Sequence, residues 1–245
     1  MNRVLHSSIL DGTGLVRFAF STRVGGNDGS HFGMNTSFNV GDAPENVRAS
    51  RQELLASIGS TPDQLALPMQ VHSAIVRRVE SAGNYPECDG LLTSSPDICL
   101  GVSTADCVPI FILDPAKAAI AGVHAGWRGT AGGIVTQAIV AMQAEFGSRP
   151  ADLIAFIGPC ADVCCYQVGD EVASRFDNNF VVRKEGAVLL SLKAANVSAL
   201  SLSGVPLTNI EVSPHCTISE SHLFHSYRRD KERSGRMMGV IRLIR

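Results

Sequence analysis

The sequence predicts an α+β protein, with a mixed β-sheet flanked by helices. Apolar runs of strand length alternate with segments of helical periodicity along all 245 residues. Two of the runs are separated by a tight turn, which favours antiparallel neighbours in a mixed strand order; an α/β arrangement is the alternative. No low-complexity linker and no repeat of fixed period interrupts the pattern. We therefore expect residues 1–245 to form a single domain.

The first elements are a strand, a long loop and a helix. Leu15–Ser21 is apolar enough for a strand. The stretch Arg23–Asp42 that follows is rich in Gly, Asn and Ser and is too long for an ordinary turn, so we interpret it as a candidate binding loop. Pro44 suits the first turn of a helix that Gly59 would end.

The centre of the chain predicts the core of the sheet. Ile98–Ser103, Val108–Leu113 and Ala118–His124 are three apolar runs of strand length. The turn Asp114-Pro115 joins the last two, which predicts that they pair antiparallel.

A helix and four further elements complete the predicted fold. Thr130 is a candidate N-cap and Gly147 a candidate C-cap of a helix with one apolar face, formed by Ile134, Ala138, Met142 and Phe146. Beyond it we expect a strand at Leu153–Ile157, a helix at Leu192–Leu202, a strand at Val205–Val212 and a closing strand at Arg236–Ile244.

Composition narrows the classes of partner. A net charge of −2 argues against a nucleic acid or an anionic membrane, both of which select a strong basic excess. The N-terminal residues lack the apolar core of a signal peptide, and no apolar run approaches the ~20 residues of a membrane span. We expect a cytoplasmic protein with a small-molecule substrate. The seven cysteines, an odd number that includes the pair Cys164-Cys165, indicate reduced thiols.

Three potential metal ligands stand at the ends of apolar runs. They are His72 in LPMQVHSAIV, Cys107 in STADCVPIFIL and His124 in AIAGVHAGWRG. Two imidazoles and one thiolate suit zinc, and three protein ligands leave a position for water or substrate. Taken singly, each residue has a plainer interpretation as a buried thiol or a hydrogen-bonded core histidine. Together they predict a catalytic site for one zinc ion.

Several sequence blocks resemble those of a known family. QVHSA, TADCVPI, VHAGWRGT, IGPCADVCCYQVG and FHSYRRDKERSGRM are similar, in order and spacing, to the signature blocks of the multicopper polyphenol oxidase, or laccase-domain, family. The likeness begins at FSTRVGG and reaches Met238, so it covers nearly the whole chain.

The resemblance implies a function and a ligand set. It implies a zinc-dependent purine nucleoside phosphorylase that also has adenosine deaminase and methylthioadenosine phosphorylase activity, with a purine nucleoside and phosphate as its partners. The family's metal ligands fall on His72, Cys107 and His124. One position departs from the pattern, because Gln167 stands where members often carry Glu. A role that needs a carboxylate there is therefore in doubt.

The older oxidase name fits the residues poorly. A four-copper oxidase assembles its trinuclear cluster largely from His-X-His pairs, and none of the seven histidines lies two residues from another. A single blue-copper centre would use two His, one Cys and a weak Met, and Met69 is close to His72 in sequence. Copper therefore remains an alternative to zinc.

Two acidic residues have competing interpretations. Asp106 adjoins the predicted thiolate ligand, so it is a candidate general acid/base, and equally a residue that caps its strand. Asp89 precedes a glycine, which favours a turn residue over a hydrogen-bond partner for a ligand histidine.

Phosphorolysis needs an anion site beside the metal. Guanidinium groups bind oxyanions in bidentate fashion, and the candidates are Arg23 in the long loop, Arg128 before a predicted helix, and Arg228 with Arg229. We favour Arg128, because a helix start adds backbone donors. The run Arg228–Arg236 is otherwise typical of a solvated face.

Other cysteines and histidines carry weaker signals. His215, Cys216, His222 and His225 lie within eleven residues, but their spacing matches no zinc-finger pattern, so we expect no structural zinc there. The remaining cysteines, at 88, 99, 160, 164 and 165, are interpreted as packing or site-lining residues, with Cys160 a candidate neighbour of the substrate.

Two other functions remain open. In the first, Cys107 is a thiolate nucleophile and a histidine its base, in a hydrolase acting on an amide such as a cell-wall precursor peptide; related proteins have been linked to editing of such precursors. In the second, the blocks form a binding surface around a closed metal site and the protein is not an enzyme.

Overall fold

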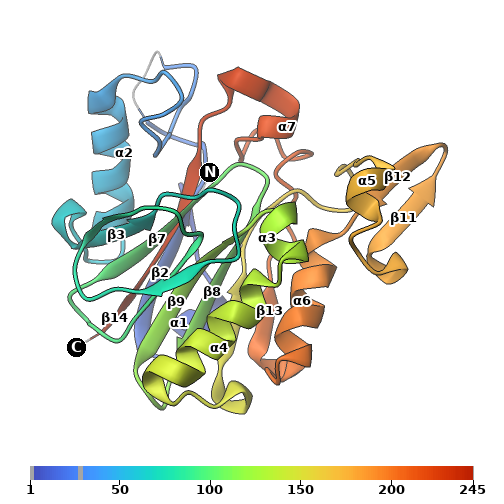
Figure 1. Cartoon of the computed structure of the whole chain (residues 1–245). Coiled ribbons are helices and arrows are strands. Elements are labelled where there is room, and N and C mark those ends of the chain that lie inside the picture. The colour runs from blue at the N-terminus through green and yellow to red at the C-terminus, as the bar shows by residue number, and fades with distance from the viewer. Residues whose placement is uncertain (1–2, 27–29, 245) are drawn as a thin grey trace.

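The computed structural model of the chain describes residues 3–26 and 30–244. Residues 27–29 of the predicted binding loop lie outside the described residues, and the rest of Arg23–Asp42 contains no helix or strand among those described. Two mixed six-stranded sheets, with helices against their outer faces, form the body (Figure 1). The predicted α+β class is confirmed, although the sequence did not show that the strands divide between two sheets.

Parallel and antiparallel pairs occur in both sheets. The first sheet has the strand order β1 (Val4–Leu5), β2 (Val16–Ser21), β14 (Met237–Leu243), β7 (Cys99–Thr104), β3 (Leu65–Pro68), β5 (Gly83–Tyr85). The second has the order β13 (Ile210–Val212), β10 (Ile154–Ile157), β8 (Val108–Asp114), β9 (Ala119–Ala125), β6 (Gly90–Thr93), β4 (Val76–Arg78).

The layers are held together by three apolar clusters. Between the sheets, the ring of Phe18 packs edge-on against Phe111 and Phe156, at centroid distances of 4.9 and 5.1 Å. Helix α2 (Pro44–Ala56) buries Leu54 and Leu55 against the outer face of the first sheet. Helices α4 (Ile134–Phe146) and α6 (Leu192–Leu202) cover the second sheet on its other side (Figure 1).

Most of the predicted elements are present. The strands predicted at 15–21, 98–103, 108–113, 118–124 and 153–157 correspond to β2, β7, β8, β9 and β10, and the helices predicted after Pro44 and at Leu192–Leu202 to α2 and α6. Strands β8 and β9 pair antiparallel across the Asp114-Pro115 turn, with Val108 opposite Ala125. The closing strand, β14, is one residue shorter at each end than predicted.

The helix predicted from Thr130 is in fact two helices. Helix α3 (Trp127–Ala131) contains Thr130, and α4 begins after Gly133, whose φ of 77° and ψ of 31° interrupt the helical path. Thr130 is therefore not a cap; its hydroxyl oxygen instead accepts a hydrogen bond from Nδ2 of Asn196 at 3.1 Å. The predicted C-cap is right, because Gly147 has the left-handed φ of 67° that closes α4.

Several short elements escaped prediction. Only Ile210–Val212 of the predicted strand Val205–Val212 is β13, because a turn of 3₁₀ helix at Leu207–Asn209 precedes it. Helix α5 (Asp170–Ala173) and the hairpin β11 (Val181–Lys184) and β12 (Ala187–Leu190) form an arm that projects from the body (Figure 1). The short strands β1 and β3–β6 were also not predicted. Neither were the short helices α1 (Ser8–Asp11) and α7 (Tyr227–Asp230).

Two predictions about the chain as a whole are tested by the structure. Among the described residues, no helix has the length and apolar character that crossing a membrane requires. All seven cysteines are free, as predicted.

Candidate metal centre

The three predicted ligands come together at one end of the second sheet. His124 lies in β9 next to its last residue, Cys107 directly precedes β8, and His72 lies in the connection after β3 with a φ of 61°. Their ligand atoms all lie within 4.8 Å of one another. Sγ of Cys107 is 3.9 Å from Nε2 of His72, and the two imidazole rings meet edge to face at 5.0 Å.

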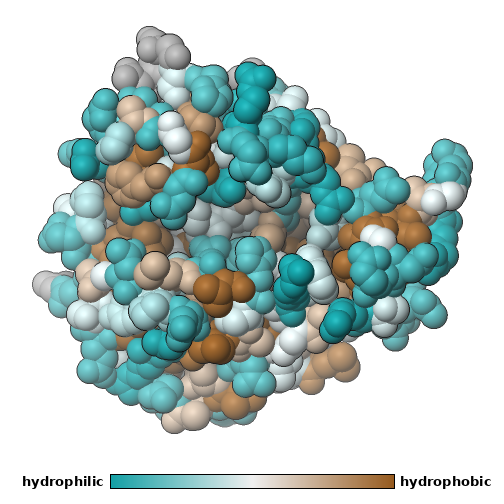
Figure 2. Space-filling model, turned by 45° about the horizontal axis from the view of Figure 1, so that its top comes forward, coloured by the Kyte–Doolittle hydropathy of each residue, from teal (hydrophilic) through white to brown (hydrophobic). Residues whose placement is uncertain are grey.

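This donor set fits a zinc-sized cation. Tetrahedral zinc places a sulfur and a nitrogen ligand about 3.5 Å apart, given bonds of about 2.3 and 2.0 Å. The Cys107–His72 separation of 3.9 Å needs only a small contraction to reach that value. His72 is exposed whereas His124 is buried, so the group is open on one side. Figure 2 turns this end of the molecule forward and shows a surface hollowed near the centre of the view.

Asp89 supports two of the three ligands. Its Oδ1 accepts hydrogen bonds from Nδ1 of His124 at 2.8 Å and from the backbone N–H of His72 at 2.9 Å. Its Oδ2 accepts from the backbone N–H groups of Val71 and Ser73 and from the Ser73 hydroxyl. Although burial opposes ionisation, the bonds from His124 and Ser73 lower the pKa of Asp89 to about 2. The preference for a plain turn residue was therefore wrong.

The ligand side chains are electrostatically coupled. Burial raises the pKa of the Cys107 thiol, but the charges and hydrogen bonds of His124 and His72 outweigh it and bring that pKa to about 6. Burial likewise opposes protonation of His124, yet Cys107 and Asp89 raise its pKa to about 9. At neutral pH Cys107 is a thiolate, which is the form that binds metals and attacks electrophiles.

The absence of a side chain at Gly126 leaves space for two of the ligands. A Cβ atom added to it would lie 2.8 Å from Cδ2 of His72 and 3.1 Å from Sγ of Cys107. Both distances are shorter than ordinary carbon contacts. A side chain at position 126 would therefore displace one of the two ligands.

Asp106 holds three segments together beside the thiolate. Its Oδ1 accepts from the hydroxyl of Thr217 at 2.7 Å, and its Oδ2 from the hydroxyl of Ser226 at 3.0 Å and the backbone N–H of Arg228 at 2.6 Å. The residue is buried and has an unusual φ of 92°. These contacts favour a positioning role, and the general acid/base role stays a prediction.

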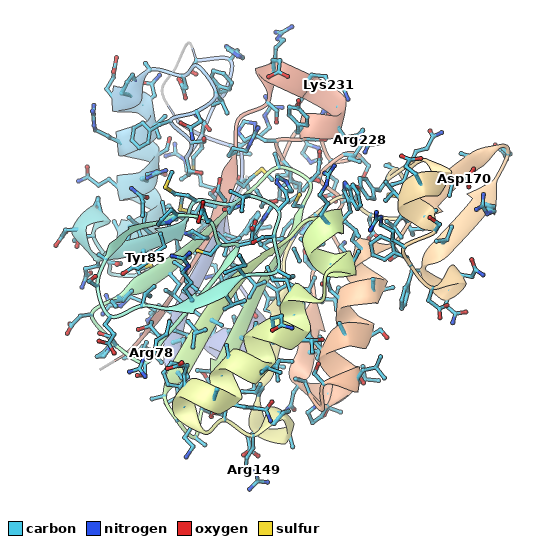
Figure 3. All side chains as sticks on the ribbon, in the orientation of Figure 1. Arg78, Tyr85, Arg149, Asp170, Arg228 and Lys231 are labelled. Atoms are coloured by element: carbon cyan, nitrogen blue, oxygen red, sulfur yellow. The ribbon has the colours of Figure 1, made fainter. Side chains whose placement is uncertain are left out.

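A tyrosine interacts with Cys107, and two arginines interact with that tyrosine. The Arg228 guanidinium lies 5.0 Å from the centroid of the Tyr166 ring, and Arg128 lies 4.2 Å from that of Trp127. Burial and the negative charge of Cys107 raise the pKa of the Tyr166 hydroxyl to about 12, while Arg228 and Arg128 oppose the shift. All of these groups are therefore close enough to interact. Arg228 lies on the side of α7 that faces α3 and the α5 arm (Figure 3).

The other arginine candidates are bound to backbone. Arg23 donates to the carbonyl oxygens of Ser221 and His31, which ties it to the loops rather than to the ligands. Arg229 donates to the carbonyls of Thr217, Ile218 and Phe224 and pairs with Asp230. Both arginines are thus engaged by backbone oxygens, and an anion-binding role for Arg23 stays a prediction.

Gln167 contributes its backbone. Its carbonyl oxygen accepts a hydrogen bond from the guanidinium of Arg228, and its side chain is exposed. The position therefore orients an arginine of the site through an atom that every residue type possesses.

The side chains of the other histidine and cysteine cluster, at positions 215, 216, 222 and 225, do not meet at one point. Nδ1 of His215 pairs with Glu220 at 2.8 Å, and Nε2 of His225 contacts the carbonyl oxygen of Met34 at 3.0 Å. Cys216 instead approaches Cys164 and Cys165. Among the described side chains, these four residues therefore do not form one ligand group.

Comparison with known proteins identifies the family. The sequence profile described as "Multi-copper polyphenol oxidoreductase laccase" matches residues 17–244. The chain belongs to this laccase family. The resemblance seen in the sequence blocks is thereby confirmed.

Relatives in the laccase family carry other names. A Deinococcus radiodurans protein named "Purine nucleoside phosphorylase" is 37% identical, with 94% of this chain and 90% of that protein aligned. "Adenosine deaminase RL5", from an unknown prokaryotic organism, is 37% identical, with 89% and 90% aligned. The crystal structure of YlmD from Geobacillus stearothermophilus superposes with a TM-score of 0.88 at 32% identity, covering 94% of this chain and 92% of that one.

Sequence reasoning missed two supporting residues and set a third aside. Tyr166 and Gly126 lie inside quoted blocks, CCYQV and HAGWRG, so their signal was the block itself. Asp89 was considered and set aside, because an Asp-Gly pair is also the commonest turn signal.

Proposed function

We propose that this protein is a zinc-dependent purine nucleoside phosphorylase that also deaminates adenosine and cleaves methylthioadenosine. The observation that carries the proposal is the open His72–Cys107–His124 group with arginines beside it. Two His and one Cys, with a free side, are a ligand set of catalytic zinc. The names of relatives at 37% identity supply the substrate class.

His72, Cys107 and His124 would hold one zinc ion, and the ion would supply a Lewis acid when bound. Asp89 fixes the Nδ1 proton of His124, so its Nε2 is the nitrogen left to bind. The lowered pKa of Cys107 makes its thiolate available at neutral pH, and a cation would displace the proton that His124, with its raised pKa, holds on Nε2.

The residues around the ligands suit phosphate and a nucleoside. Arg128 and Arg228 would bind phosphate and direct it to C1′ of the ribose as the bond to the purine opens. Tyr166 offers a ring face beside Arg228 for an aromatic base. Asp106 holds the backbone of Arg228 and so positions that arginine.

The test measures products and metal together. Zinc-loaded protein is incubated with inosine, adenosine or methylthioadenosine, with and without phosphate. We expect free base and ribose 1-phosphate, or its methylthio analogue, only when phosphate is present, and inosine from adenosine without it. Each of the three ligands replaced by Ala should lower zinc content and activity together, whereas Cys99→Ala, in the buried core away from this group, should lower neither.

A second candidate function is a thiol amide hydrolase. The thiolate of Cys107, the imidazole of His124 and the carboxylate of Asp89 form the chain of contacts that a nucleophile, base and orienting group require. In that case Cys107→Ala would abolish cleavage of a muramyl-peptide nucleotide and leave the metal content unchanged. An inactive Cys107→Ala variant that retains full zinc contradicts the phosphorylase proposal.

A further inference from the structure

A second group of three potential metal ligands lies outside the candidate metal centre. Cys164 and Cys165 belong to the 158–169 loop after β10, and Cys216 belongs to the 213–226 loop after β13. Their three sulfur atoms all lie within 4.8 Å of one another. Cys164 is exposed, Cys165 is half-buried and Cys216 is buried, so the group opens towards solvent on one side.

The two loops are fixed to each other independently of the sulfurs. Nζ of Lys193, almost fully buried, donates to Oδ2 of Asp162 at 2.8 Å and to the carbonyl oxygen of His215 at 2.7 Å. The N–H of Thr217 donates to the carbonyl oxygen of Cys160 at 3.0 Å. These bonds hold the residues beside all three cysteines, so the chain itself brings the sulfurs together.

Hydrogen bonds within the group lower the pKa of one of the three thiols. Burial opposes ionisation of Cys216, but donors from Ser219, Asp162 and Cys164 outweigh it, so the pKa of Cys216 is lowered. Burial and the neighbouring sulfurs raise the pKa of Cys164 to about 12 and also raise that of Cys165. Of the three sulfurs, that of Cys216 is therefore the one whose ionisation the neighbouring donors favour.

The separations suit a single thiophilic ion. With metal–sulfur bonds of about 2.3 Å, two thiolates of one tetrahedral ion lie about 3.8 Å apart. A group already within 4.8 Å needs to contract by roughly 1 Å at most to reach that distance. An all-sulfur set selects soft d¹⁰ ions over Mg²⁺ or Ca²⁺, which prefer oxygen.

We propose that Cys164, Cys165 and Cys216 form a second metal site, which binds one thiophilic d¹⁰ cation, Zn²⁺ or Cu⁺, through three thiolates. Binding exchanges thiol protons for the cation, so it releases protons and weakens as the pH falls. The site is separate from the His72–Cys107–His124 group and does not depend on the function proposed for that group.

The second site adjoins the first through the chain. Tyr166 directly follows Cys165 and its N–H donates to the carbonyl oxygen of Asp162 at 2.8 Å. Thr217 directly follows Cys216 and donates its hydroxyl to Asp106. A cation held by the three cysteines would therefore restrain two residues that line or support the candidate active site.

The test counts ions on reduced, metal-free protein under anaerobic conditions. Separate samples of the full chain receive excess Zn²⁺ or Cu⁺, are desalted, and are analysed for metal and for ultraviolet thiolate-to-metal charge-transfer absorption. We expect wild type to retain two ions of at least one of these metals. Cys164→Ser and Cys216→Ser should retain one, and Cys107→Ala should retain the one held by the cysteine cluster.

The controls separate binding from folding. Cys164 is exposed, so Cys164→Ser should not disturb the fold, and Cys99→Ala should still retain two ions. Circular dichroism checks every variant. Retention by Cys164→Ser and Cys216→Ser of as many ions as wild type overturns the proposal, and so does a single ion in wild type that Cys107→Ala loses. So does a protein that, before reduction, lacks metal and has a mass lower by two hydrogens, because a disulfide would then be the resting state of the cluster.

Discussion

Nδ1 of His124 donates a hydrogen bond to Oδ1 of Asp89 at 2.8 Å. The same carboxylate accepts hydrogen bonds from the backbone N–H groups of Val71, His72 and Ser73. One buried side chain therefore orients two proposed ligands that are more than fifty residues apart. Such an arrangement fixes the imidazole tautomer and makes the free nitrogen more basic.

Asp89→Asn should weaken zinc binding by roughly tenfold to a hundredfold, because the amide replaces a charged acceptor that fixes His124. Competition with a coloured chelator measures the affinity, and thermal unfolding of the metal-free protein measures the structural cost. An affinity equal to that of wild type would mean that Asp89 supports only the backbone of residues 71–73.

Gly126→Ala should reduce metal affinity while the fold is retained. The added methyl would meet His72 and Cys107 at 2.8 and 3.1 Å, and His72 is exposed and free to turn away. Gly122→Ala, four residues earlier in β9, is the matched control, because its methyl would meet core side chains of Val102, Leu100 and Phe111 instead. The control should lower thermal stability and leave zinc affinity unchanged; the reverse pattern would exclude a steric role for Gly126.

Arg128→Ala and Arg228→Ala should each raise the KM for phosphate by roughly tenfold to a hundredfold, the loss expected for a charge-assisted hydrogen bond. Their zinc content should not change. Arg149, at the opposite end of the molecule in Figure 3, provides the control variant Arg149→Ala. Steady-state rates at varied phosphate check the prediction, and an unaltered KM in either variant removes that arginine from the anion site.

Gln167→Glu should retain zinc and change activity modestly. The contact with Arg228 uses the backbone carbonyl, which the substitution preserves, and the exposed side chain gains only a solvated charge. A new dependence of kcat/KM on pH near the range of a carboxyl group would indicate that the side chain reaches the substrate. Loss of zinc would show instead that the residue supports the metal ligands.

His225 should make the fold sensitive to acid. Burial, aided by Arg23 and Arg236, lowers its pKa from 6.5 to about 4, against the opposing bond to Met34. The unfolded chain then binds more protons than the native protein as the pH falls from 6.5 to 4, so stability is full above pH 6.5 and decreases through this window. The loss is on the order of 3 kcal/mol.

His225→Gln keeps a donor for the Met34 carbonyl without a titrating ring. Denaturant unfolding of wild type and variant at several pH values should show a smaller loss of stability in the variant between pH 6.5 and 4. Parallel curves would show that other groups cause the acid sensitivity.

Local pattern determined much of the fold. The apolar runs that became β7, β8 and β9, the turn at Asp114-Pro115 and the left-handed Gly147 all follow from side-chain periodicity and backbone freedom within a few residues. The helix predicted from Thr130 was wrong because the break comes from the backbone of Gly133, and an isolated glycine pair does not reveal its own dihedral angles.

The ligand set could also be predicted, because His72, Cys107 and His124 have side chains that suit one metal and lie in distinctive blocks. Their convergence, the support from Asp89 and the room beside Gly126 depend on how β8, β9 and the connection after β3 pack. The cysteine cluster, too, unites Cys164 and Cys165 with a residue some fifty positions later. Sequence determined which groups are present, whereas tertiary structure decided which of them meet, because contacts between distant residues arise only when the sheets and loops pack together.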